Sequence, residues 1–272
     1  MKSSHVGSVS SPEHAMEIDT VTRERLLLDT LVELADTLVA DFDVVGLLDL
    51  LTRRCSELFS LKGAGAVLAD QHGYLRVMAC STEQIWLTDV LQAQNHDGPL
   101  LDSYRSGKPN SDGDLEAARS RWPTFAPLAI DAGIRSVCAF PLHLRDALLG
   151  ALGLFGSESA TLSAEEARRA KALADVASVG IVQFAVAHDH DALAARVGVA
   201  MQNRTIVEQA QGMLAESNRV ELDQAFTLLR RYAQIHDQRL TEVAFTIVTG
   251  GLDLPLPVSV DENEAGTDTT ID

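Results

Sequence analysis

Cysteine, lysine, aromatic residues and long apolar runs are all scarce in this 272-residue chain. Its three cysteines, Cys55, Cys80 and Cys138, are an odd number without C-x-x-C spacing, which disfavours a disulfide framework or a zinc cage. No apolar run approaches the roughly 20 residues of a membrane-spanning helix, and the first residues lack the apolar segment of a secretory signal peptide. We therefore expect a cytoplasmic protein with no membrane segment.

Positive charge is scarce as well. The chain has 22 Lys and Arg residues against 39 Asp and Glu residues, a formal net charge of −17. Such a chain does not bind nucleic acids or anionic membranes indiscriminately, so any nucleic-acid contact has to come from a local group of cations. The length suggests two domains, with enough residues to bury a sizeable core.

The spacing of apolar residues up to residue 160 predicts helices and strands in turn. Helices are expected at 23–59 (two), 82–107 and 125–132, and strands at 65–69, 74–80, 135–144 and 148–155. A stretch with Pro, Gly and Asp, 107–123, is predicted to be a loop. This order predicts an α/β (α+β) fold in which a sheet is flanked by helices.

After Ser163 the pattern is helical. Ser163 and Glu166 have capping-box spacing and open a long helix. A seam of residues recurs along it every three or four positions: Ala170, Leu173, Ala177, Gly180, Phe184 and Ala187. Such a seam is typical of a helix that forms a homodimer, although a helix that covers the sheet has the same pattern. Three amphipathic stretches follow and predict an all-α three-helix bundle, with Asp237 as the N-cap of its third helix.

These patterns divide the chain into five parts. A polar lead (1–21) and an acidic tail (250–272) are predicted to be disordered. Between them we expect a sheet domain (22–160), a connecting helix for dimerisation or signalling (161–192) and the helical bundle (193–249).

Two consecutive segments of the sheet domain carry a family resemblance. Val137–Leu142 (VCAFPL) leads by a predicted hairpin to Leu149–Phe155 (LGALGLF). This pair resembles the central hairpin of a GAF domain. The resemblance implies a sensor domain that binds a small-molecule or protein effector, which the sequence does not identify.

The C-terminal segment resembles an ANTAR domain on three blocks: Arg204–Leu214 (RTIVEQAQGML), Ala225–Ala233 (AFTLLRRYA) and Leu240–Ala244 (LTEVA). The combination is similar to bacterial GAF–ANTAR transcription antitermination regulators, which bind RNA hairpins in nascent transcripts. One position departs from the family pattern, because Gln211 stands where a basic residue is frequent.

The resemblance implies RNA contact at a set of positions in these blocks: Arg204, Gln211, Gly212, Arg230, Arg231 and Arg239. The segment is nearly neutral, yet all its cations are arginines, which pair with phosphate and stack on unpaired bases. The alternative is that these arginines are ordinary ion-paired side chains and that Gly212 serves helix packing.

In the GAF-like domain, side chains expected to line a ligand pocket are Cys80, Trp86, Trp122, Phe125 and Cys138. Aromatic residues at such places also serve as core. The run 188–191 (His-Asp-His-Asp) is not expected to bind metal, because residues i and i+2 of a helix point apart. No phosphate loop, zinc motif or nucleophile turn occurs, so neither cofactor nor catalytic residue is predicted.

Three functional hypotheses follow from these residues. The first is a non-enzymatic RNA-binding regulator that forms a homodimer. The second is a dimeric GAF ligand-binding module without RNA binding. The third is a thiol enzyme resembling the GAF-type free methionine sulfoxide reductases, in which Cys80 or Cys138 would react.

Overall fold

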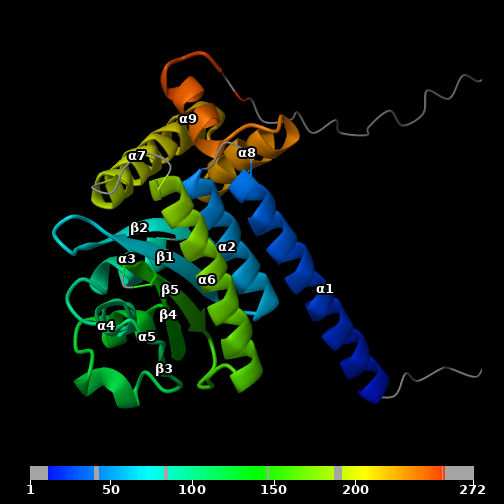
Figure 1. Cartoon of the computed structure of the whole chain (residues 1–272), viewed down its shortest axis with the longest axis vertical. Helices are drawn as coiled ribbons and strands as arrows, with labels where there is room; N and C mark the ends of the chain where they lie inside the picture. The colour runs from blue at the N-terminus through cyan, green and yellow to red at the C-terminus, as the bar shows by residue number, and fades with distance from the viewer. Residues whose placement is uncertain are drawn as a thin grey trace, which may run out of the picture.

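The computed structural model describes residues 12–39, 43–82, 85–145, 147–186, 192–252 and 254. The chain builds one sheet with helices on both faces and then places three further helices over one end of that unit (Figure 1). The predicted fold class, a sheet flanked by helices and followed by an all-α bundle, is thus confirmed.

The sheet has five strands in the order β2-β1-β5-β4-β3, and every neighbouring pair is antiparallel. The strands are β1 Gly63–Ala69, β2 Leu75–Cys80, β3 Asn110–Asp112, β4 Ser136–Leu144 and β5 Ala147–Gly156. Because helices cover both faces, the central strands consist almost wholly of apolar and small residues. Gly150 is required where β5 meets β1, since a Cβ there would lie 1.9 Å from the Val67 carbonyl oxygen.

One face of the sheet is covered by short helices: α3 Ile85–Ala93, α4 Pro99–Ser106, the 3-10 helix Ala117–Ser120 and α5 Phe125–Asp131. The single helix predicted over 82–107 is therefore two helices. Gly98, at a φ of 148°, turns the chain immediately before Pro99 and ends any continuous helix. Strand β3 and the 3-10 helix lie within the segment predicted to be a loop.

Two longer helices, α2 Val44–Leu58 and α6 Ala164–Val186, cover the other face, and α1 Pro12–Val39 packs on the outside of both. Residues 12–21, predicted to be disordered, are helical, because extending a helix that is already anchored costs far less than nucleating one. The remainder of the predicted lead, 1–11, lies outside the described residues, as does nearly all of the predicted acidic tail.

The capping box at the start of α6 is confirmed. The Ser163 hydroxyl accepts a hydrogen bond from the Glu166 amide, and the Glu166 carboxylate accepts one from the Ser163 amide. The seam of α6 faces the protein's own core: Ala170, Leu173 and Ala177 are fully buried. Its prediction as a dimer surface is therefore wrong, and the seam covers the sheet. The Phe184 side chain, Ala187 and the predicted His-Asp run at 188–191 lie outside the described residues.

The C-terminal bundle consists of α7 Ala192–Asn218, α8 Leu222–Ile235 and α9 Leu240–Val248. Val207, Phe226 and Val243 contribute one core residue from each helix. The Asp237 cap prediction is wrong: α9 begins at Leu240, and Asp237 lies in the preceding turn with a φ of 50°.

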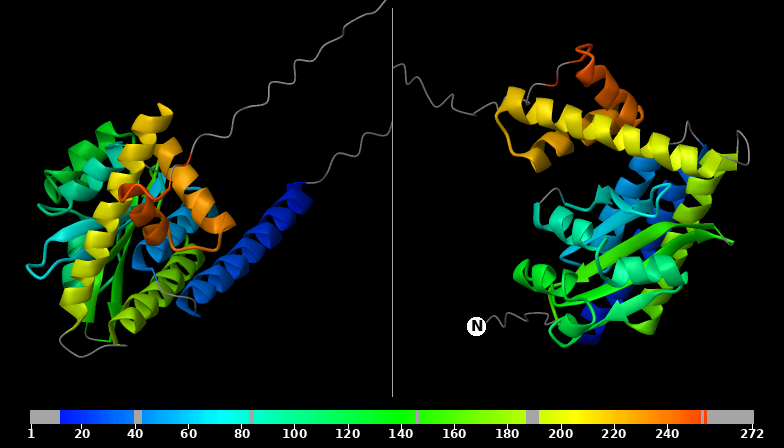
Figure 2. Two further views of the ribbon diagram at one scale, coloured as in Figure 1. Left: turned by 90° about the horizontal axis from the view of Figure 1, so that it is seen from above. Right: turned by 90° about the vertical axis from the view of Figure 1, so that its left-hand side faces the viewer.

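Asp43, from the segment before α2, ties the bundle to the sheet unit. One of its carboxylate oxygens accepts the Val45 amide at 3.0 Å and caps α2, and the other accepts the Thr241 amide of α9 at 3.3 Å. Burial raises the pKa of Asp43, although these hydrogen bonds oppose the shift. Viewed from above, α7 to α9 lie across the end of the sheet unit where α2 begins (Figure 2). No helix in the described part of the chain is both long and apolar enough to span a membrane.

We predict that Asp43→Ala lowers the free energy of unfolding by about 1–2 kcal/mol, because two helix-terminal amides lose their acceptor. Asp43→Asn keeps an acceptor oxygen without the buried charge and should lose less. Urea unfolding followed by circular dichroism measures both variants. Equal losses in the two variants would contradict a capping role for Asp43.

Candidate functional site

The predicted RNA-contacting arginines of the bundle occupy very different environments. Arg204, on α7, is 8% exposed; its Nε donates to Glu208 at 2.9 Å, and its guanidinium lies 6.0 Å from the centre of the Phe226 ring. Arg204 is therefore buried in the bundle and contributes little to its surface. Arg239, at the N-cap of α9, forms an ion pair with Glu242.

Arg230, on α8, contacts the sheet unit. Its guanidinium donates to the Asp49 carboxylate of α2 at 2.9 Å and lies 4.7 Å from the Phe226 ring centre. Asp49 is 4% exposed and also accepts from Arg53 at 3.1 Å. Within the described part of the chain the buried Nε of Arg230 has no hydrogen-bond partner. Arg230 is thus held at the interdomain contact, by an arrangement that leaves one of its donors unsatisfied.

Arg231, the next residue, is exposed, as expected for neighbours on a helix of which only one can face inward. Arg219, which was not among the predicted contacts, is also exposed, in the turn between α7 and α8 with a φ of 54°. The only feature of the sequence that could have predicted the exposure of Arg219 is its position at the end of an amphipathic stretch.

Gln211 and Gly212 are adjacent in the chain but have different environments. Gln211 is 4% exposed, and its Nε2 donates to the Leu222 carbonyl at 2.9 Å, which ties α7 to the start of α8. In this arrangement the Gln211 carboxamide makes a structural contact between two helices. Gly212 is exposed, and a Cβ there would meet no atom within 4 Å. Packing does not require a glycine at this position. The neighbouring Met213 is also exposed, at 44%.

The predicted ligand pocket on the sheet face is filled. Trp122 and Phe125 are buried and pack edge to face with ring centres 6.0 Å apart, and the Trp122 indole donates to Asp102 at 3.0 Å. They belong to the core between the sheet and the short helices. The side chain of Trp86 lies outside the described residues.

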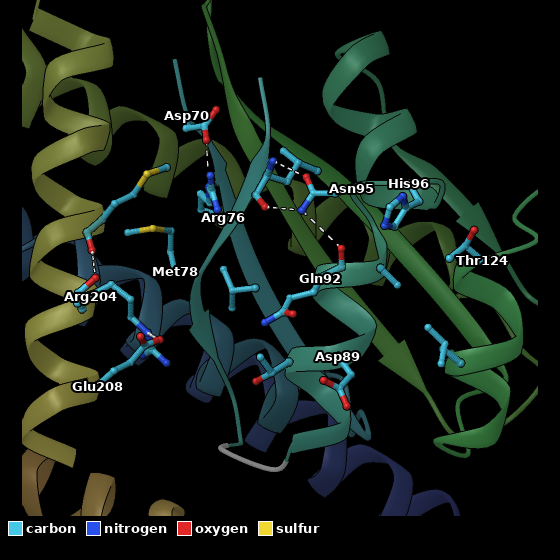
Figure 3. A pocket seen from close by; sticks show the side chains of 17 residues that line it. Asp70, Arg76, Met78, Asp89, Gln92, Asn95, His96, Thr124, Arg204 and Glu208 are labelled. Atoms are coloured by element: carbon cyan, nitrogen blue, oxygen red, sulfur yellow. Dashed lines mark hydrogen bonds and ion pairs between the residues drawn. The ribbon is translucent and has the colours of Figure 1, made fainter. Parts of the chain in front are cut away.

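A different cavity lies between strand β2, helix α3 and helix α7. We call it the interdomain cleft (Figure 3). Its volume is about 1060 Å³, and Arg76, Met78, Gln92, Met201 and Thr205 are among its lining residues. The sequence pattern does not predict this cleft, because its walls come from two segments far apart in the chain, within residues 70–128 and 201–208.

Comparison with known protein families finds a match for each of the two parts of the molecule. A GAF domain family model matches residues 26–182, which is more than half of the chain. The chain belongs to the GAF domain family. An ANTAR domain model matches residues 195–248. A GAF domain followed by an ANTAR domain is the architecture of the GAF–ANTAR antitermination regulators, so the family prediction is confirmed.

Solved GAF domains are similar to this one at low identity. The GAF domain of an Acinetobacter phosphoenolpyruvate-protein phosphotransferase is 14% identical, with a TM-score of 0.47 over 60% of this chain and 96% of that one. A phycocyanobilin-bound GAF domain from a cyanobacterial phytochrome is 17% identical, with a TM-score of 0.49 over 60% and 98%. The free methionine-R-sulfoxide reductase of Neisseria meningitidis is 16% identical, with a TM-score of 0.47 over 65% and 94%. Such likeness concerns the fold alone. Among curated proteins, none matches this chain.

The cysteines of the GAF domain do not converge on one site. Cys138 packs with the core on the α2 and α6 side of the sheet, whereas Cys80 packs with the core on the opposite side. All three cysteines are buried. Burial raises the pKa of the Cys138 thiol and raises that of Cys55 to about 12. Cys80 and Cys138 were predicted to line one pocket, but they lie on opposite sides of the sheet. In the described part of the chain, His, Cys, Asp and Glu side chains form no group of three that could hold a metal ion.

We predict that Cys55 in the native protein reacts with iodoacetamide at pH 8 on the order of 100-fold more slowly than in urea, because a raised pKa leaves little thiolate and burial blocks access. Mass spectrometry of the labelled protein over time measures the rates for each cysteine. Comparable native and unfolded rates at Cys55 would overturn this assignment.

Proposed function

We propose that the protein is an RNA-binding transcription antitermination regulator, in which an effector at the GAF domain controls the binding of the ANTAR domain to hairpins in nascent mRNA. The observation that carries the proposal is the ANTAR bundle itself, with the blocks around Val207, Phe226 and Val243 each contributing to one core. We place the protein in the cytoplasm and assign it no catalytic reaction.

The RNA surface that we propose consists of the exposed positions of the bundle. Arg231 and Arg219 supply charge, and Gly212 lets a nucleic-acid backbone approach α7 without steric conflict. Arginine suits this role, since its planar guanidinium pairs with phosphate and stacks on the unpaired bases of hairpin loops. Few cations are involved, so base contacts in the loop supply much of the affinity.

We predict that Arg231→Ala weakens binding to paired short hairpins about 5- to 10-fold and reduces the salt slope by about 1. Arg119→Ala, which removes an exposed arginine of the GAF domain, is the matched control and should change neither quantity. Fluorescence anisotropy across a salt series, with a scrambled-loop RNA for comparison, measures both. Binding that ignores the loop sequence in the unmodified protein would refute the RNA role.

Control of RNA binding by the GAF domain is supported by the contact between Asp49 and Arg230. Phosphate and the Asp49 carboxylate present the same kind of charge to the guanidinium, so RNA and the GAF domain compete for Arg230. The unsatisfied Nε of Arg230 leaves the docked arrangement short of one hydrogen bond that a phosphate oxygen can supply. An effector that binds the docked and the released arrangement with different affinities shifts the balance between them, and so controls RNA binding.

We predict that Asp49→Asn tightens hairpin binding about 3- to 10-fold, because it weakens the competitor of the RNA for Arg230. Arg53→Ala is the control: it removes the other partner of Asp49 but leaves Arg230 held, and should give no gain. The same anisotropy titration, with both variants checked for native circular dichroism, decides the matter. Unchanged or weaker binding by a folded Asp49→Asn protein would count against competition.

A homodimer remains part of the proposal, through a surface other than the seam of α6. Leu28 and Val32, one helical turn apart on α1, are both at least 60% exposed and provide an apolar stripe for a second copy. Two ANTAR domains in one particle gain affinity for paired hairpins through their effective concentration.

A further inference from the structure

The interdomain cleft has an unusual wall, because it runs along the outer edge of the sheet. Strand β2 is the edge strand next to β1. Its residues Arg76 and Val77 line the cleft, and helix α7 of the ANTAR domain forms the opposite wall. An edge strand presents backbone donors and acceptors that no neighbouring strand occupies.

The backbone of one residue on this edge already has a hydrogen-bond partner, which shows the kind of group that the edge can bind. The carboxamide of Asn95 forms two hydrogen bonds with Leu75: its oxygen accepts the Leu75 amide at 2.7 Å, and its nitrogen donates to the Leu75 carbonyl at 2.8 Å (Figure 3). A planar carboxamide therefore fits the N–H and C=O of one strand residue. The backbone groups of Leu75 consequently point away from β1.

Strand geometry then fixes the direction of the next such pair. Arg76 pairs with Leu68 and Val77 with Val67 in regular register, and the bulge in this strand pair lies after Val77. Backbone groups alternate in direction along a strand, so those of Val77 point outward like those of Leu75. Among the hydrogen bonds of the described residues, none outside the sheet ends on the backbone of Val77. A second two-bond position thus faces the cleft.

The side chains around this position favour a flat, uncharged ligand. Met201, on the α7 wall, offers a polarisable sulfur atom that packs well against an aromatic ring. Both arginines in the lining have a carboxylate beside them: Arg76 pairs with Asp70 at 3.0 Å and Arg204 with Glu208 at 2.9 Å. Desolvation acts to raise the pKa of Asp70, but hydrogen bonds from His72, Tyr74 and Arg76 lower it by more. The Asp70 carboxylate therefore stays ionised. A phosphate or carboxylate ligand would have to displace one of these partners.

We propose that the interdomain cleft is the effector site of the protein, and that its ligand is an uncharged aromatic ring bearing a carboxamide or lactam group. The ligand oxygen accepts the Val77 amide, and the ligand N–H donates to the Val77 carbonyl. The regulatory role of this ligand rests on the proposed function, whereas its binding to the cleft does not.

Occupancy of the cleft is coupled to the ANTAR domain through α7. Arg204 lines the cleft, and its guanidinium lies over Phe226, the same ring that Arg230 contacts. A ligand seated between β2 and α7 therefore contacts the group that supports the position of Arg230. This connects the effector site with the Asp49–Arg230 contact through two side chains.

Nicotinamide is the probe, and nicotinate, which is anionic and lacks the amide N–H, is its matched control. We expect nicotinamide to bind with a dissociation constant on the order of millimolar, as suits a fragment of its size, and nicotinate to bind at least about tenfold more weakly. Titration of the full chain labelled with ¹⁵N-valine should shift the Val77 amide signal, which is identified by its loss in Val77→Ala.

Two variants locate the site. Val77→Pro removes the outward N–H, which the sheet does not use, and should weaken nicotinamide binding about tenfold, whereas Val77→Ala should not. Thr205→Trp fills the cleft from the exposed side of α7 and should abolish binding, whereas Thr205→Ala should not. If Val77→Pro fails to fold, Thr205→Trp decides alone.

A Val77 signal that does not move at 20-fold the expected dissociation constant, about 20 mM nicotinamide, would overturn the proposal, as would binding that persists in folded Thr205→Trp or equal binding of nicotinate. Hairpin binding is measured separately on the same samples. Loss of nicotinamide binding with loop-dependent RNA binding intact would reject this effector site alone, and the converse would reject the RNA function alone.

Discussion

The arrangement of this protein depends on how helix α2 holds the ANTAR bundle. Asp43 at its start caps two helices of different domains, and Asp49, six residues later, pairs with Arg230. Asp49 is buried and Asp43 is partly buried. A buried ion pair such as that of Asp49 costs about 3–5 kcal/mol when one partner is lost. The two domains therefore have one favoured relative position, and the interdomain cleft exists only in that position.

The same contacts assign different roles to arginines that look alike in the sequence. Arg204 and Arg230 lie against the Phe226 ring and pair with carboxylates, so in the docked arrangement both are held by contacts within the molecule. Arg231 is left for the solvent and for RNA. A bundle of almost no net charge can thus retain an RNA surface, because its cations are divided between structure and recognition.

The sheet of the GAF domain separates two cores, and this division limits its chemistry. Cys80 and Cys138 belong to opposite cores, and Trp122 and Phe125 fill the space where a ligand was expected. What the sheet still offers is its edge. Polar backbone groups at an edge strand remain available to a ligand after every side chain on the two faces has been used for packing.

The sequence by itself determined the two domain families, the strands of the central hairpin and the capping box at Ser163. These are local features, since hydrophobic periodicity and capping act within a few residues. It also placed three helices in the ANTAR segment, but not the cap of the third, because the acceptor is Asp43, almost 200 residues away. Only the tertiary structure decided which face of α6 is buried, which arginine pairs with Asp49 and where the cleft lies. Each of these depends on contacts between segments distant in the chain, which no local pattern records.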